Sequence, residues 1–138
     1  MSFVLDASTT LAWHFEDEAS AEVRALAHRA FADGVAVPQH WLLEVISALL
    51  RGERRNRSAP AQSQEFVTFL QDLDAEIDDL DQDRAVSVLL PLARDQRLSL
   101  YDAAYLELAD RRRLPMATLD ASLIRAANAI GVELILGS

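Results

Sequence analysis

Two aspartates stand directly after predicted strands, where their carboxylates could act on a common ligand. Asp6 ends the apolar run Phe3–Leu5, and Asp120 ends the run Pro115–Leu119. Short apolar runs of this kind are typical of strands buried in a parallel sheet. The carboxyl ends of such strands form one edge, and ligands of open α/β sheets bind there. Asp6 and Asp120 could therefore be neighbours in a binding site.

A third acid, Glu44, lies in a predicted helix that is otherwise apolar. It is the only charged residue of the run 41–50. At helical spacing it falls on a narrow polar strip with His40, Ser47 and Arg51, and that strip could simply face solvent. However, a helix this apolar on its other sides should be mostly covered. A covered carboxylate needs a partner, because burying an unpaired charge is costly, and a cation in a shared pocket would serve.

Each acid also has a purely structural interpretation. Asp6 and Asp120 can cap the helices that follow them by accepting a bond from a backbone N–H group. The fourth acid, Asp102, follows Ser99 by three residues, which resembles a capping box, although Glu or Gln is usual at the third position. Capping and metal binding are compatible, so both interpretations stay open for each aspartate.

The four acids are more informative together than singly. Four carboxylates cannot share a small volume while all are ionised unless cations compensate their charge. Ligand sets made only of oxygen select hard ions such as Mg²⁺ or Mn²⁺. Sites of this kind support in-line hydrolysis of phosphodiesters, in which one ion activates water and another stabilises the leaving oxygen. The sequence therefore favours a metal-dependent enzyme that acts on phosphodiester bonds.

The elements that must position these acids alternate along the chain. This alternation predicts an α/β fold, a three-layer sandwich with helices on both faces of a central, mainly parallel five-stranded sheet. Pro91 is expected to kink its helix, and the third strand is expected at an edge. We find no repeat or linker, and we expect a single domain over residues 1–138. The predicted strands are 3–5, 35–37, 76–80, 115–119 and 132–136, and the predicted helices are 8–15, 18–32, 39–54, 62–73, 84–94, 98–112 and 121–130.

Composition narrows the class of protein further. The chain has no cysteine, which excludes disulfides, thiolate metal sites and cysteine nucleophiles. No apolar stretch is long enough to span a membrane and no signal peptide is evident, so we expect a cytoplasmic protein. The net charge of −9 argues against non-specific binding of duplex nucleic acid. An acidic enzyme can still act on nucleic acid if its carboxylates hold metal ions that screen the phosphates.

The basic residues exclude several rivals, because all of them are arginines and the chain has no lysine. Phosphate-accepting receiver domains and haloacid-dehalogenase-type phosphatases require a lysine, and the latter also need an aspartate where this chain has Ser8. Rossmann and P-loop nucleotide binders need a glycine-rich turn after the first strand, which the segment 6–9 lacks. One non-enzymatic alternative stays open, a module that binds RNA or protein through a metal without cutting.

Four segments resemble the PIN-domain family, and specifically the VapC-type toxins of bacterial toxin–antitoxin pairs. VLDAST (4–9) resembles the first acidic motif of the family and WLLEVISALL (41–50) the second. LSLYDAAYLELA (98–109) and LPMATLDASLIRAANAIGV (114–132) resemble the third and fourth, and this C-terminal half is the most specific part. The resemblance covers nearly the whole chain, and the four acids show no departure from it.

The resemblance implies an endoribonuclease, the toxin of a type II toxin–antitoxin pair, that hydrolyses RNA with Mg²⁺ or Mn²⁺. Asp6 and Asp102 correspond to the acids most directly tied to the metal, while Thr118 and Ser8 match polar residues that border the site. The resemblance also implies the strand order 3-2-1-4-5, a cognate VapB-type antitoxin, and a homodimer that forms a heterotetramer or larger assembly with it. The residues that take the places of the catalytic, metal-holding acids are Asp6, Glu44, Asp102 and Asp120.

Two arginine clusters could contact RNA phosphates. The first follows Leu50 and contributes Arg51, Arg54 and Arg55, and the second, a weaker candidate, is 111–113. Both clusters can instead be helix ends placed favourably against the helix dipole. The three histidines lack metal-ligand spacing, so we assign none of them to the metal. We expect the antitoxin to dock an apolar segment between the early helices and to offer a basic residue to the acidic pocket.

Overall fold

The computed structural model of the protein describes residues 1–135, except for the side chain of Glu16. Four parallel strands form one sheet in the order β3-β2-β1-β4, which agrees with the first four positions of the expected order. The central strand β1 is fully buried, as its apolar sequence predicts. The strands are β1 (Phe3–Leu5), β2 (Val35–Pro38), β3 (Glu76–Asp78) and β4 (Met116–Ala117).

The fifth strand expected over 132–136 is reduced to a single bridge in the described residues. Leu134 forms a parallel bridge with Met116, whose N–H donates to the Glu133 carbonyl over 2.9 Å. The chain therefore runs beside β4, at the expected edge. The prediction of a five-stranded sheet is wrong, because the described residues form four strands and this one bridge. The physical reason is that β4 is only two residues long and offers little backbone to pair with. Leu136 lies outside the described residues.

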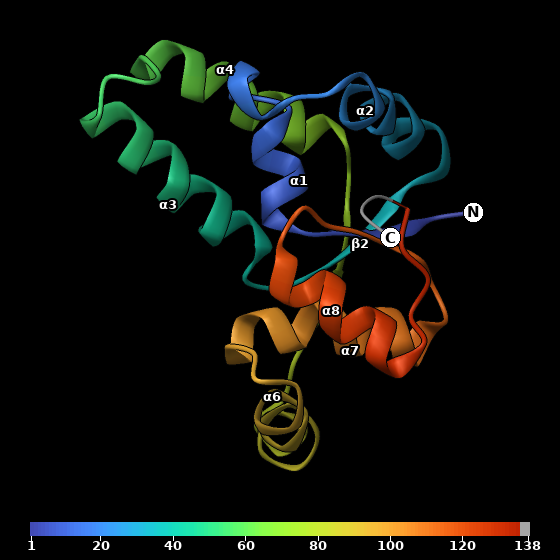
Figure 1. Cartoon of the computed structure of the whole chain (residues 1–138). Helices are drawn as coiled ribbons and strands as arrows, with labels where there is room; N and C mark the ends of the chain where they lie inside the picture. Colours follow the sequence, from blue (N-terminus) through green and yellow to red (C-terminus); the bar gives the residue numbers. More distant parts are fainter. Residues whose placement is uncertain (136–138) are drawn as a thin grey trace.

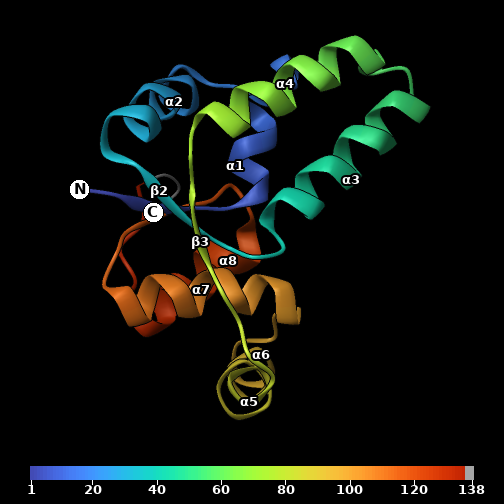
Figure 2. The ribbon, with the colours of Figure 1, turned by 180° about the vertical axis from the view of Figure 1, so that it is seen from behind.

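Helices cover both faces of the sheet, as the alternation predicts. In Figures 1 and 2, α1, α2 and α4 lie on one face and α7 and α8 on the other. The helices are α1 (Ala7–Ala12), α2 (Ala21–Asp33), α3 (Trp41–Arg54), α4 (Pro60–Asp72), α5 (Gln82–Arg84), α6 (Leu90–Gln96), α7 (Leu100–Arg112) and α8 (Ala121–Ile130), with a 3₁₀ turn η1 (Glu16–Glu18) and a π-helix η2 (Ala85–Leu89). None of the described helices combines the length and the apolar character that crossing a membrane requires.

Local signals set most helix ends. Gly34 and Gly131 follow α2 and α8 with φ of 85° and 82°, a conformation that glycine adopts without strain. The helix predicted from residue 18 begins later because the Ser20 side chain caps α2, accepting a bond from the Val23 N–H. A π-helix, η2, ends at Leu89, two residues before Pro91, and the kink expected at Pro91 stays a prediction.

Four helices, α1, α3, α7 and α8, begin at the carboxyl edge of the sheet. Figure 1 shows the first turns of α3, α7 and α8 gathered beside the ends of β1 and β2, on the left of that view. The helix α7 packs on both central strands, and α1 packs on α3. From this edge α3 and α4 extend away from the sheet as a helical hairpin (Figures 1 and 2). The fold therefore brings the segments that carry all four predicted acids to one edge.

Candidate functional site

Asp6 directly follows β1, and only 3 % of its surface is exposed to solvent. Its Oδ1 accepts a bond from the Thr9 N–H over 2.9 Å, so Asp6 caps α1 as the structural interpretation predicts. Its carboxylate also accepts bonds from the Ser8 hydroxyl over 2.8 Å and from the Thr118 hydroxyl over 2.5 Å. Both residues expected to border the site therefore hold this carboxylate in place.

The environment of Asp6 makes its charge costly. Burial raises the pKa of this carboxyl from 3.8 to about 6, although the hydrogen bonds from Thr118, Thr9 and Ser8 act to lower it. These partners are neutral, and a bound cation would favour the ionised form far more strongly. The buried carboxylate is thus suited to a site that acquires positive charge on binding.

Asp120 belongs to the same hydrogen-bond network as Asp6. The Thr118 hydroxyl, which donates to Asp6, also accepts a bond from the Asp120 N–H over 3.0 Å. The Ser8 hydroxyl similarly accepts a bond from the Leu119 N–H over 3.0 Å. Asp120 caps α8 through its Oδ1, which accepts from the Leu123 N–H over 3.0 Å. These hydrogen bonds join the ends of β1 and β4 directly, as expected for two aspartates that follow neighbouring strands.

Asp102 lies in the first turn of α7, where the Ser99 hydroxyl caps the helix by accepting a bond from the Asp102 N–H over 3.1 Å. Burial raises the pKa of Asp102, and the charges of Asp120 and Glu44 raise it further. Like charges raise the pKa of a carboxyl because they disfavour its ionised form. Asp102 therefore connects the acids of the strand ends with the acid of α3.

Glu44 lies in the first turn of α3 and has two close partners. Its Oε1 accepts a bond from the Tyr105 hydroxyl over 2.8 Å and lies 3.1 Å from His40 Nε2. Burial acts to raise the pKa of Glu44, but His40 and the Tyr105 hydroxyl outweigh it, so the pKa is lowered. Glu44 is therefore kept ionised by its neighbours. The expected covering of α3 is wrong in part, because Leu43 is 69 % exposed.

Tyr105 is the residue that the sequence analysis missed. Burial raises the pKa of its hydroxyl, and the charges of Glu44, Asp6 and Asp102 raise it further, so Tyr105 lies among three of the four acids. A signal was available, because Tyr105 follows Asp102 by three residues and shares its helix face. His40 precedes Glu44 by four residues and lies on the same polar strip of α3.

The four acids share one edge, but they do not form a preassembled ion cage. In the part of the chain that the structure describes, no group of three Asp, Glu or His side chains is close enough to hold a metal ion. The donor set nevertheless fits Mg²⁺ or Mn²⁺, because it consists of carboxylate oxygens whose mutual repulsion is visible at Asp102.

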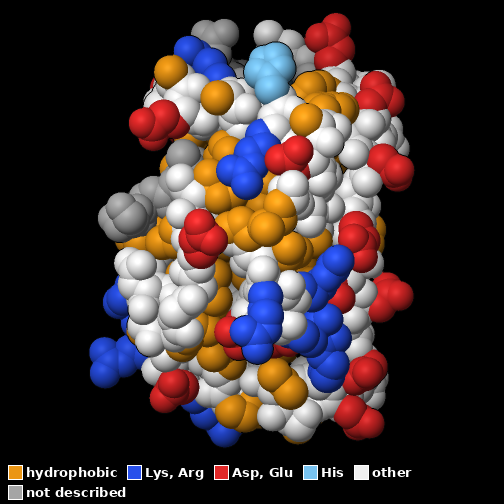
Figure 3. Space-filling model, turned by 90° about the vertical axis from the view of Figure 1, so that its right-hand side faces the viewer, with side chains coloured by type: hydrophobic (Ala, Val, Ile, Leu, Met, Phe, Trp, Pro, Cys, Tyr) orange, Lys and Arg blue, Asp and Glu red, His pale blue; other side chains and the backbone are white. Residues whose placement is uncertain are grey.

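The two arginine clusters have different surroundings. Arg111 bonds Glu107 over 2.8 Å and Asp78 over 2.7 Å, and Arg112 bonds Glu76, so two of the three arginines of the second cluster are engaged in ion pairs. Figure 3 shows basic side chains next to acidic ones on the side where α7 ends. The candidates of the first cluster, Arg51, Arg54 and Arg55, are exposed on the last turns of α3.

The buried carboxylate of Asp6, held by Thr118 and Ser8 at the carboxyl edge of a parallel sheet, lies where ligands of open α/β sheets bind. The chain belongs to the PIN-domain family, because the PIN domain matches residues 3–129. No curated protein shows significant similarity to the sequence.

Two solved structures share the fold at low sequence identity. PAE2754 from Pyrobaculum aerophilum superposes with a TM-score of 0.70 at 20 % identity, covering 91 % of this chain and 79 % of that one. A toxin–antitoxin complex from Klebsiella pneumoniae superposes with a TM-score of 0.56 at 19 % identity, covering 86 % of each chain. These likenesses concern the fold, and they agree with the α/β architecture that the sequence predicts.

Proposed function

We propose that this protein is a Mg²⁺- or Mn²⁺-dependent endoribonuclease, the VapC-type toxin of a type II toxin–antitoxin pair. The observation that carries the proposal is the hydrogen-bond network through which Thr118 and Ser8 join Asp6 to the backbone before Asp120. It brings acids from opposite ends of the chain to one edge, where the charges of Glu44 and Asp120 act on Asp102. A PIN domain that carries these four acids has the groups that phosphodiester hydrolysis needs.

Each residue of the proposed site would have its own role. Asp6 and Asp102 would hold the cation, with Asp120 and Glu44 completing its oxygen environment. When bound, the cation supplies Lewis-acid activation of water and neutralises charge on the phosphate. Thr118, which donates to Asp6 over 2.5 Å, fixes the orientation of that carboxylate before any ligand arrives. The Tyr105 hydroxyl does the same for Glu44.

The proposed partners follow from the same assignment. The cognate VapB-type antitoxin would place an apolar segment between the early helices and a basic residue in the acidic pocket. A structural neighbour is itself a toxin–antitoxin complex, which supports a protein partner of this kind. A homodimer, and a heterotetramer or larger assembly with antitoxin, complete the proposal. The RNA target and the antitoxin would be met in the cytoplasm.

Cleavage of RNA by the antitoxin-free protein tests the proposal. The purified protein should cut structured RNA with Mg²⁺ or Mn²⁺ and stop when EDTA is added. Asp6→Asn and Asp102→Asn should abolish cleavage while the circular dichroism spectrum stays native. Asp110→Asn is the matched control, because Asp110 is an exposed aspartate near the other end of α7 and should leave cleavage intact. Cleavage that persists in both site variants would refute the assignment.

The alternative of a metal-dependent binding module without activity predicts a different result. Wild-type protein would then bind RNA or a partner protein in the presence of Mg²⁺, and no product would form at any metal concentration. Neutralising the four acids tests the antitoxin contact separately in a pull-down. Unchanged affinity for the antitoxin would exclude a basic antitoxin residue in the acidic pocket.

A further inference from the structure

An open groove borders the acidic site on the side of α3. Its volume is about 330 Å³, and it lies between α3 and the first turn of α7. Glu44 is part of its wall, so the groove is continuous with the proposed active site. The residues that line it are His40, Leu43, Glu44, Ser47, Arg51 and Tyr101. The groove therefore contains the polar strip of α3 together with one aromatic residue of α7.

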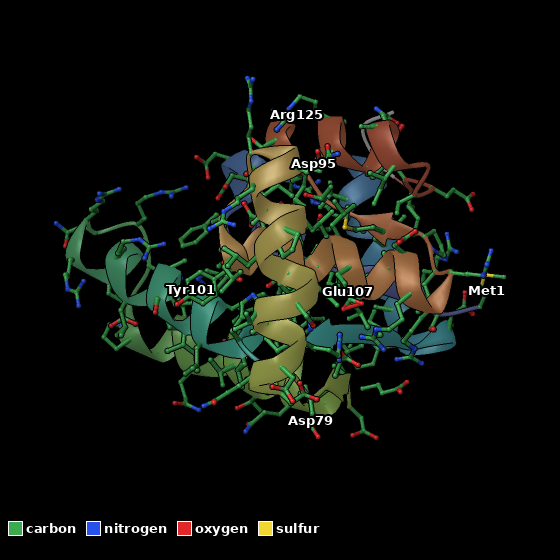
Figure 4. All side chains as sticks on the ribbon, turned by 90° about the horizontal axis from the view of Figure 1, so that it is seen from below. Met1, Asp79, Asp95, Tyr101, Glu107 and Arg125 are labelled. Atoms are coloured by element: carbon green, nitrogen blue, oxygen red, sulfur yellow. The ribbon has the colours of Figure 1, made fainter. Side chains whose placement is uncertain are left out.

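Tyr101 presents an exposed aromatic ring in this groove. It is 61 % exposed although it directly precedes Asp102 in the chain. Figure 4 shows it beside α3. Its ring packs edge-on against His40 with the ring centres 5.1 Å apart, and His40 in turn packs against Tyr105 at 5.2 Å. The ring is thus supported from one side by packed aromatic groups, and its exposed surface is suited to stack on a flat ligand.

Arg51 gives the same groove a positive charge. It is exposed and follows Glu44 by seven residues on α3, about 10 Å along the helix axis. It also lines a second hollow of about 230 Å³ together with Arg55, whereas Arg57 in the same hollow is paired with Asp17 and Glu18. The exposed Arg51, Arg54 and Arg55 therefore place positive charge at the end of α3 that lies away from the acids. In a protein of net charge −9, such a track is where a polyanion can approach the site.

We propose that this groove binds one nucleotide of the substrate strand beside the cleaved bond, with its base stacked on Tyr101 and a neighbouring phosphate held by Arg51. The inference rests on the proposed nuclease function and assigns Tyr101 and Arg51 of this chain to an unpaired nucleotide next to the cleaved bond. A single strand is required because a base can stack on a side chain only when its face is not covered by a neighbouring base pair. A basic group alone would accept any polyanion, whereas the exposed ring beside it selects a nucleic acid.

Binding of RNA without cleavage tests the groove. The probe is a fluorescein-labelled single-stranded RNA of mixed sequence, roughly 12 nucleotides long, within the usual span of single-strand sites. Fluorescence anisotropy is measured with Mg²⁺ in the Asp6→Asn background. Tyr101→Ala should weaken binding about 5-fold to 100-fold, as loss of one base stack does, while Tyr101→Phe should keep wild-type affinity. Replacing single bases by 2-aminopurine should show quenched fluorescence at one position, and Tyr101→Ala should relieve it.

Arg51→Ala tests the phosphate contact independently. It should weaken binding and reduce the slope of log affinity against log salt by about one phosphate contact. Arg24→Ala, which removes an exposed arginine of α2, is the matched control and should change neither quantity. The phosphate contact is overturned if Arg51→Ala has a native circular dichroism spectrum and the same slope of log affinity against log salt as the wild type.

The outcomes separate this inference from the nuclease proposal. If the wild type cleaves RNA while Tyr101→Ala and Arg51→Ala bind it normally, the groove is not an RNA site and the nuclease proposal stands. In that event, loss of antitoxin binding by the same variants would assign the groove to a protein segment. If RNA binding depends on both residues and no cleavage occurs, the groove inference stands and the nuclease proposal fails.

Discussion

Replacing Asp6 by asparagine should stabilise the metal-free protein at neutral pH. In the folded protein burial raises the pKa of Asp6 from 3.8 to about 6, so the folded chain holds a proton that the unfolded chain has released. Between about pH 4 and pH 6 the folded state therefore binds more protons than the unfolded state. The free energy of unfolding falls as pH rises through this window, and the penalty is complete above pH 6.

The size of this effect follows from the shift. A difference of about two pKa units corresponds to roughly 3 kcal/mol of unfolding free energy between the two ends of the window. Asparagine has nearly the same shape and retains one oxygen for the Thr9 N–H bond, which is 2.9 Å long in the native protein. Its side chain carries no charge, so Asp6→Asn should lose this pH dependence and keep most of the local structure.

Urea unfolding in EDTA at a series of pH values measures the effect. The difference in unfolding free energy between the wild type and Asp6→Asn isolates the contribution of Asp6. The other carboxyls, including Asp102 with its raised pKa, contribute equally to both proteins. Adding Mg²⁺ at pH 7 should stabilise the wild type and leave the variant almost unchanged, since the variant lacks the carboxylate that would hold the ion. Parallel stability–pH curves for the two proteins would refute the argument from burial.

Three further substitutions test other contacts of the fold. Tyr105→Phe removes the hydroxyl that donates to Glu44 over 2.8 Å, and it should weaken Mn²⁺ binding in calorimetry and lower stability by about 1 kcal/mol, since Glu44 is partly exposed. Glu107→Gln neutralises a buried carboxylate between two arginines, beside the helical segment 82–96 in Figure 4, and should cost about 3 kcal/mol in urea unfolding without changing the RNA cleavage rate. Gly52→Ala places a Cβ 2.8 Å from the ring of Phe15, so it should lower the melting temperature despite the higher helix propensity of alanine, and a rise would show that the ring moves freely.

Much of the architecture was predictable because it depends on local chemistry. Alternating apolar runs and helical repeats predicted a parallel α/β sheet, and the glycines after α2 and α8 marked their ends. The two aspartate caps also follow from residues within three positions of each acid. Interactions of this range are encoded in short segments, which is why a single sequence suffices to find them.

The extent of the sheet and the covering of α3 were not predictable in the same way. The strand expected over 132–136 depends on how much backbone β4 offers, and β4 is short. The exposure of Leu43 depends on how far the hairpin of α3 and α4 extends beyond the sheet. Neither quantity is set by the composition of the segment itself, because both depend on the packing of other elements around it.

The sequence by itself determined which acids stand at strand ends and helix starts, since their positions follow from local pattern. Only the tertiary structure decided what each acid contacts. The bond from Thr118 to Asp6 joins residues 112 positions apart, and the bond from Tyr105 to Glu44 spans 61 positions. Contacts of this kind arise from the packing of whole helices and strands, so the burial that shifts the pKa of Asp6 and the groove beside Glu44 exist only in the folded chain.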